Sequence, residues 1–278
     1  MKLFVKNLTN VDFSYLHTDR GLMGESWLAQ LELEGELNTQ GMICDFGIVK
    51  RNVRDWLDTY VDHRLVVPCT SQRTQITHSG DNLALKWRYP SGEVLICDAP
   101  EEAFCQVDRA EITAESLAHW CEAQLLALFG DEVQGLKIRF VPESIEGAYY
   151  HYSHGLQQHD GNCQRIAHGH RSIVEVYLDG QRSETVEAQW AQRWKDIYLG
   201  TTAHRVEGDA GYNKYCYSAP QGAFSLMLPT AYCDDLETET TVEYIAQHLA
   251  VKVKAEYPHS AVEVRAYEGI GKGAVASA

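Results

Sequence analysis

An internal repeat constrains the fold of this chain more than any other feature of its sequence. Residues 20–35 align without gaps with residues 165–180, and residues 113–118 align with residues 241–246. The stretch that ends at position 180 alternates apolar and polar residues, as a half-buried strand does. Residues 113–118 and 241–246 each open an amphipathic helix with threonine and glutamate at its start. The order strand hairpin, helix, helix, strands therefore runs twice.

Each copy of the repeat ends on a strand and a glutamate. The strand covers residues 136–141 in the first copy and residues 262–266 in the second. Glu143 follows the first of these strands and Glu268 follows the second, each ahead of a Gly-Ala pair. A glutamate at the same place in both copies is either a solvated turn residue or a binding group.

The boundary between the copies falls near residues 145–147. This predicts a first unit over residues 1–146 and a second unit over residues 147–278. A chain of this length has room for two hydrophobic cores. Because no proline- or serine-rich linker separates the units, we expect them to contact each other directly.

The second copy concentrates three histidines and a cysteine within seventeen residues. His168 and His170 stand two apart at the start of the alternating strand, so their side chains point to one face. A third imidazole from His154 completes the three-nitrogen ligand set of a catalytic zinc, which keeps one coordination position open. Cys163 lies between them, close enough to reach that position. A structural zinc site with Cys163 as the fourth ligand is the alternative.

The first copy does not repeat this ligand set. Met23 and Glu25 stand at the positions of the paired histidines. His17 is the candidate counterpart of His154, but one imidazole cannot form a three-histidine site.

The first copy instead carries a carboxylate next to an imidazole, at Asp62 and His63. This is either a surface pair at a helix end or a pair that tertiary structure places in a site. The corresponding stretch of the second copy, near residues 190–204, has no Asp-His pair. Each copy has therefore lost what the other retains.

Charge and cysteine usage limit the partners and the compartment. The net charge of −15 argues against nucleic acid and anionic membranes, both of which need a basic face. The eight cysteines are scattered without a Cys-x-x-Cys pair, which is typical of reduced thiols. No stretch approaches the ~18 apolar residues of a membrane span, and the N-terminus lacks a signal-peptide core. These observations predict a cytoplasmic protein with no nucleic acid or membrane partner.

Taken together, the motifs resemble the family of 6-pyruvoyl-tetrahydropterin synthases and 6-carboxytetrahydropterin synthases. The family pattern is a His, a Cys with His-Gly-His soon after, Gly-x-x-x-Asp-Phe (here Gly41 to Phe46), Asp-His, Thr-x-Glu at a helix start, and a late Glu. The resemblance implies an α+β tunnelling fold (T-fold). Each unit would be a four-stranded antiparallel sheet with two helices on one face, and units would oligomerise into a barrel. Since the usual member is about half this length, the chain resembles a tandem fusion of two units that forms homo-oligomers.

The resemblance also implies roles for the singled-out residues. Zn²⁺ would bind His154, His168 and His170, with Cys163 as the group that abstracts a proton. Asp62 and His63 would complete the proton relay. In the family the cysteine and the Asp-His pair come from different subunits, so a fused chain needs each of them only once.

Glutamates and helix starts would bind the substrate. Glu143 or Glu268 would anchor the pterin ring by accepting from its N–H groups. The late motif after Glu268 lacks the threonine usual in the family, which leaves both glutamates as candidates. The helix starts would add substrate contacts, unless they are plain N-terminal caps; their residues are Thr113, Glu115, Thr241 and Glu243.

The resemblance implies a zinc-dependent lyase acting on 7,8-dihydroneopterin triphosphate. The favoured product is 6-carboxy-5,6,7,8-tetrahydropterin, on the route to queuosine and related deazapurines. Alternatives are a 6-pyruvoyl-tetrahydropterin synthase, which eliminates triphosphate, and a non-catalytic paralogue that binds a pterin or purine. A zinc hydrolase is a further alternative, and it would not need Cys163.

Overall fold

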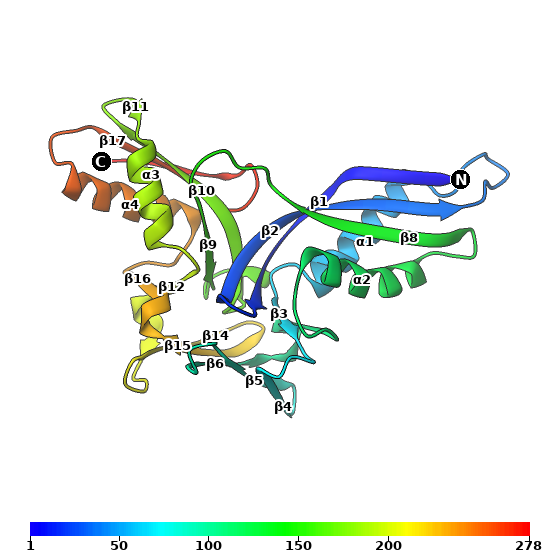
Figure 1. Cartoon of the computed structure of the whole chain (residues 1–278), viewed down its shortest axis with the longest axis horizontal. Coiled ribbons are helices and arrows are strands. Elements are labelled where there is room, and N and C mark those ends of the chain that lie inside the picture. Colours follow the sequence, from blue (N-terminus) through cyan, green and yellow to red (C-terminus); the bar gives the residue numbers. More distant parts are fainter.

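The computed structural model describes residues 1–278 and consists of two halves joined by a shared sheet (Figure 1). The first half contains a five-stranded sheet in the order β7-β3-β1-β2-β8. Its strands are β1 (Lys2–His17), β2 (Gly21–Gly35), β3 (Leu65–Pro68), β7 (Phe104–Val107) and β8 (Val133–Pro142). The pairs β1–β2 and β2–β8 are antiparallel, whereas β3 runs parallel to β1 and β7 parallel to β3.

Two helices cover one face of this sheet, α1 (Phe46–Tyr60) and α2 (Ala114–Leu125). Asp45 caps α1 by accepting from the backbone N–H groups of Gly47 and Ile48. Thr113 and Ser116 form a capping box at the start of α2. Both helices bury an apolar stripe in the same core as β1, β2 and β8.

The second half repeats this plan with more strands. Its sheet has the order β16-β12-β9-β10-β17-β18, and β11 pairs with β10 outside that path. The strands are β9 (Tyr149–His154), β10 (His168–Leu178), β11 (Gln181–Arg182), β12 (Ile197–Thr201), β16 (Cys233–Leu236), β17 (Val262–Tyr267) and β18 (Gly273–Ser277). Helices α3 (Glu184–Arg193) and α4 (Val242–Glu256) share a core with β9, β10 and β17. The expected pair of helices on one face is therefore present in both halves.

The expected four-stranded antiparallel sheet is correct for the second half only. There β9, β10, β17 and β18 form an antiparallel set. In the first half only β1, β2 and β8 are antiparallel, because the chain passes from β8 to β9 without a counterpart of β18. Both sheets also carry two parallel strands that the sequence pattern did not predict.

A third sheet, which we call the bridging sheet, contains strands from both halves in the order β13-β14-β15-β6-β5-β4. Its strands are β4 (Thr74–Ser79), β5 (Asn82–Arg88), β6 (Val94–Pro100), β13 (Arg205–Val206), β14 (Tyr212–Ala219) and β15 (Gly222–Pro229). The halves meet where β15 pairs antiparallel with β6. Figure 1 shows this sheet below the junction of the two larger sheets. The direct contact expected between the units is thus a continuous sheet with a core of its own.

The halves also touch at equivalent positions of their first hairpins. Ser14 pairs with Gly24 in the first half, and Ser153 pairs with Gly169 in the second. The two serine hydroxyls form a buried hydrogen bond of 2.7 Å. A Cβ on Gly169 would lie 2.7 Å from the Gly24 Cα and 2.3 Å from the Tyr152 carbonyl oxygen. Glycine at both positions is therefore what lets β2 and β10 approach so closely.

Short 3₁₀ segments connect the remaining elements: η1 (Glu101–Ala103), η2 (Leu126–Leu128), η3 (Asn162–Gln164), η4 (Thr202–His204) and η5 (Thr230–Tyr232). The helices are amphipathic or capped surface elements of at most 15 residues. None of them combines the length and the apolar character that a membrane crossing requires.

Candidate metal centre and composite site

Three imidazoles converge where β9 ends and β10 begins. His154 is the last residue of β9 and pairs with His168, the first residue of β10. His170 lies two residues further along β10, so the alternation of the strand turns it to the same face as His168. All three side chains are fully buried, and one ring nitrogen of each lies within 4.8 Å of the others.

The Nδ1 atom of each histidine faces a different neighbour. His154 Nδ1 lies 3.0 Å from the Thr240 carbonyl oxygen, and His168 Nδ1 lies 2.9 Å from the Arg165 carbonyl oxygen. His170 Nδ1 lies 3.3 Å from Asp12 Oδ1, an ion-pair contact that does not have hydrogen-bond geometry. Such partners orient a ligating imidazole and leave Nε2 for the metal.

The three Nε2 atoms fit a metal ion. They belong to His154, His168 and His170, they are buried, and none has a hydrogen-bond partner. Burial, together with the neighbouring imidazoles, holds the pKa values of His154 and His168 far below the usual range. Neutral imidazoles are the form that binds metal, and three of them match the protein ligand set of a catalytic zinc site.

The Asp-His pair of the first half reaches this cluster. Both residues follow α1, where His63 adopts a left-handed backbone conformation with φ of 53°. Asp62 Oδ2 contacts His63 Nδ1. The His63 ring lies 4.9 Å from the His168 ring between centroids. Ligand atoms of His63, Cys163 and His168 all lie within 4.8 Å of one another. The pair and the cysteine, 100 residues apart in sequence, therefore meet within a single chain.

The charge state of His63 follows from these neighbours. Burial lowers its pKa, but the hydrogen bond with Asp62 and the contact with Cys163 outweigh burial and raise the pKa to about 10. His63 is therefore an imidazolium at neutral pH, held between a carboxylate and a thiol. Such a group can donate a proton next to a bound substrate.

The two candidate glutamates lie in different places. Glu268 Oε1 is 3.8 Å from His170 Nε2, and Lys272 Nζ is 3.8 Å from Glu268 Oε2. Glu143 follows β8, and its backbone carbonyl accepts from Arg171 Nη1. The structure therefore brings Glu268, and not Glu143, next to the three histidines.

The helix starts act as caps. Thr113 accepts from Ser116 N at the start of α2, and Thr241 accepts from Tyr244 N at the start of α4. Glu115 and Glu243 are exposed residues of the first turns. A role of these four residues in substrate binding stays a prediction. Helix capping alone explains the contacts of the two threonines.

The equivalent place in the first half is filled rather than open. Met23, the counterpart of His168, is buried in the apolar core and pairs with Tyr15. This register corrects one expectation: Tyr15, and not His17, occupies the position equivalent to His154. His17 instead pairs with Gly21 at the end of the hairpin.

Four contacts of the site were not predicted from sequence. They come from Asp12, Thr240, Lys272 and the carbonyl of Arg165. Asp12 and Thr240 lie far in sequence from the histidines they contact, and Lys272 reaches the site only through Asp12 and Glu268. Only the tertiary structure identifies these contacts.

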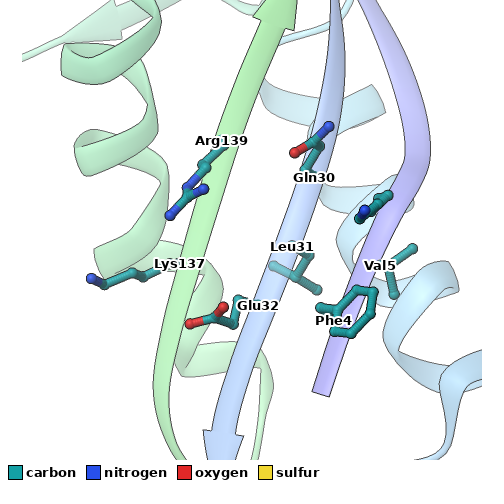
Figure 2. Close-up of a pocket in the computed structure, with 8 residues that line it drawn as sticks. Phe4, Val5, Gln30, Leu31, Glu32, Lys137 and Arg139 are labelled. Atoms are coloured by element: carbon teal, nitrogen blue, oxygen red, sulfur yellow. The ribbon is translucent and has the colours of Figure 1, made fainter. Parts of the chain in front are cut away.

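A surface pocket elsewhere shows no such chemistry. Figure 2 shows Arg139 and Lys137 of β8 beside Gln30 and Glu32 of β2, on the outer sheet surface. Phe4, Val5, Lys6 and Leu31 complete its lining. The pocket contains no histidine or cysteine, so the candidate site is the buried cluster.

The family model of 6-pyruvoyl tetrahydropterin synthase (PTPS) matches the chain twice, over residues 10–151 and 144–278. A curated protein of Pyrococcus horikoshii, “Putative 6-carboxy-5,6,7,8-tetrahydropterin synthase”, is 26% identical over 129 residues, which cover 46% of this chain and 73% of that protein. The protein of the same name from Pyrococcus abyssi is 26% identical over 136 residues, with the same coverage.

Solved structures with a similar description also match. The 6-pyruvoyltetrahydropterin synthase of Plasmodium vivax has a TM-score of 0.43 and 18% identity, covering 52% of this chain and 93% of that one. The corresponding protein of Plasmodium falciparum has a TM-score of 0.40 and 15% identity, covering 52% and 97%.

Proposed function

The chain belongs to the 6-pyruvoyl tetrahydropterin synthase family as a tandem of two units, and from this premise we propose that it is a zinc-dependent pterin lyase. Its substrate would be 7,8-dihydroneopterin triphosphate and its product 6-carboxy-5,6,7,8-tetrahydropterin. One observation carries the proposal: three buried imidazoles with unpartnered Nε2 atoms lie against a thiol and an Asp-His pair. The names of the two curated relatives support the choice of product.

His154, His168 and His170 would hold the zinc through Nε2. When bound there, zinc would act as a Lewis acid toward oxygens of the substrate side chain. The three histidines would hold the ion away from bulk solvent, because all of them are fully buried.

Cys163 and His63 would move protons at the substrate side chain. As a thiolate, Cys163 Sγ can accept a proton from a carbon held next to it. The His63 imidazolium beside it stabilises negative charge on sulfur and can donate a proton in turn. Asp62 fixes the orientation of the His63 ring through Nδ1, so Nε2 faces the site.

Glu268 would orient the pterin ring. A carboxylate can accept two N–H groups of the ring at once, and this bidentate contact sets the register of the substrate. Its place beside His170 favours Glu268 for this role over Glu143.

The test is to incubate zinc-loaded protein with 7,8-dihydroneopterin triphosphate and to identify the products by mass. We expect 6-carboxy-5,6,7,8-tetrahydropterin together with triphosphate and acetaldehyde. A 6-pyruvoyl product without acetaldehyde would overturn the choice of product. Tight pterin binding without turnover would indicate a binding paralogue. Activity that survives Cys163→Ala would favour a zinc hydrolase instead.

A further inference from the structure

A carboxylate of the first half lies against the candidate metal centre of the second half. Asp12, on β1, is 4% exposed, and its Oδ1 atom lies 3.3 Å from His170 Nδ1. A buried carboxylate is costly unless charged or polar groups surround it. The Asp12 carboxylate is nevertheless buried at the junction of the halves, next to a proposed metal ligand.

The contacts of Asp12 explain how the charge is held. The Ser26 hydroxyl donates to Asp12 Oδ1, and Lys272 Nζ lies 3.2 Å from Asp12 Oδ2. Lys272 belongs to the segment between β17 and β18, so both halves contribute to the pocket of this carboxylate. A Cβ on Gly269, which has φ of +70°, would lie 2.5 Å from Asp12 Oδ1. Glycine at that position leaves the space that the carboxylate occupies.

The backbone of Asp12 reaches the other part of the site. Its N–H donates to Asp62 Oδ1 at 2.8 Å, and its carbonyl accepts from His63 N at 2.7 Å. One residue of β1 therefore contacts His170 through its side chain and the Asp62-His63 pair through its main chain. Movement of Asp12 would disturb both groups.

The repeat places a second pair of a carboxylate and an imidazole at the equivalent position, but here the first half supplies the residue that corresponds to the histidine and the second half the one that corresponds to the aspartate. Glu25 corresponds to His170 in the repeat, and His151 corresponds to Asp12 by strand register. Glu25 Oε2 lies 3.9 Å from His151 Nδ1, which contacts the Gly24 carbonyl at 2.7 Å instead. No lysine pairs with this carboxylate. The chain thus contains a matched acid–imidazole pair that lacks a metal site.

We propose that Asp12 is a positioning residue that orients His170 for metal binding across the two halves, with Lys272 holding the carboxylate in place. This inference rests on the proposed zinc site. A carboxylate on the far nitrogen of a ligating histidine fixes the ring and strengthens the metal bond. Asp12 would do so for His170 while its main chain keeps the Asp62-His63 pair in register.

The test measures the zinc affinity of the full-length protein by competition with a chromophoric chelator. Asp12→Asn keeps the size of the side chain and removes its charge, so we expect zinc binding about 10- to 100-fold weaker than in wild type. Glu25→Gln is the matched control, and its affinity should stay within about twofold of wild type. Circular dichroism of the metal-free variants checks that each one is folded.

Lys272→Met is a second variant, because the Lys272 side chain is half exposed and its loss is tolerated more easily. It should weaken zinc binding several-fold in the same direction. Equal affinity of Asp12→Asn and wild type would overturn the inference and leave the zinc site standing. An equal loss in Glu25→Gln would also overturn it, since general packing would then be the cause. Wild-type protein without zinc affinity would instead refute the proposed function itself.

Discussion

At the scale of single residues, the neighbour of each Nδ1 decides what a histidine can do. In the second half the Nδ1 atoms of His154 and His168 face backbone carbonyls, and their Nε2 atoms are buried without hydrogen-bond partners. In the first half the same place is filled by Met23 and Tyr15, which have no nitrogen to offer a metal. The two halves therefore differ in chemistry although they share a strand register.

This difference predicts the metal content. We expect about one tightly bound zinc per chain, because a thioether and a phenol cannot replace two imidazoles. His168→Ala should lose the zinc and the turnover, whereas His17→Ala should keep both. Elemental analysis of purified protein measures the ratio. Two zinc ions per chain would contradict the assignment of the first half.

Glu25 predicts a pH dependence of stability. Burial raises its pKa to about 7 in the folded chain, against 4.5 as the ordinary value. The folded state thus keeps a proton that the unfolded state releases, so this contribution to stability is complete below pH 4.5 and is lost as the pH rises through 7. Glu25→Gln removes the effect. Between pH 5 and pH 8, the free energy of unfolding of the variant should rise by up to about 3 kcal/mol relative to that of wild type.

Urea unfolding at the two pH values measures this gain. Titrations of other groups cancel in the difference between the variant and wild type. Exposed Glu34→Gln is the control and should show no such change. A Glu25→Gln difference independent of pH would show that this carboxyl is ionised in the folded chain.

At the scale of elements, the close approach of β2 and β10 is the tightest constraint. A Cβ on Gly24 would lie 1.8 Å from the Tyr152 carbonyl oxygen and 2.5 Å from His170 N. Both atoms belong to the backbone of strands that hold the candidate ligands, so no side chain can move aside to relieve the clash. The strands would have to separate.

Gly24→Ala should therefore destabilise the chain by about 3 kcal/mol or more and weaken zinc binding, because overpacking shifts β9 against β10. Gly135→Ala on β8 is the control. Its added Cβ would meet Glu34 Cβ at 3.5 Å, an ordinary contact. Thermal unfolding and the chelator competition give the two measurements. A Gly24→Ala variant as stable as Gly135→Ala would show that the strands tolerate wider spacing.

At the scale of the whole molecule, the proximity of Cys163 and His63 predicts the outcome of mixing variants. Cys163→Ala and His63→Ala should each lose most activity and keep their zinc. Because the two groups meet within one chain, mixing the two variants under conditions that exchange subunits should restore no activity. Recovery to about a quarter of the wild-type rate would place the site between chains instead, by random pairing of subunits.

We also expect the chain to form homo-oligomers. β8 and β18 are edge strands, and exposed apolar side chains lie on them, including Val141 and Val275. Phe4 on β1 is also exposed, at 62%. Open edges of this kind are normally covered by another strand. Light scattering at micromolar concentration measures the mass, and a monodisperse monomer would contradict the expectation.

Short-range patterns in the sequence predicted the repeat, the strand that carries two of the histidines and the starts of two helices. The repeat indicated two related units, and the family match over residues 10–151 and 144–278 confirms the tandem arrangement. The two-residue spacing of His168 and His170 predicted a shared face, and the capping residues predicted the starts of α2 and α4. These inferences hold because strand alternation and helix capping depend on neighbours only a few residues apart.

Only the tertiary structure decided which distant residues meet. It placed Asp12 and Asp62-His63 against the second-half histidines, chose Glu268 over Glu143 as the neighbour of His170, and built the bridging sheet from both halves. The contacts of Asp12 and of the Asp62-His63 pair join segments separated by up to about 160 positions. The choice between Glu268 and Glu143 is a choice between two equivalent positions of the repeat. Local periodicity contains no information about such choices, because they follow from how the two cores pack across the Gly24 and Gly169 contact.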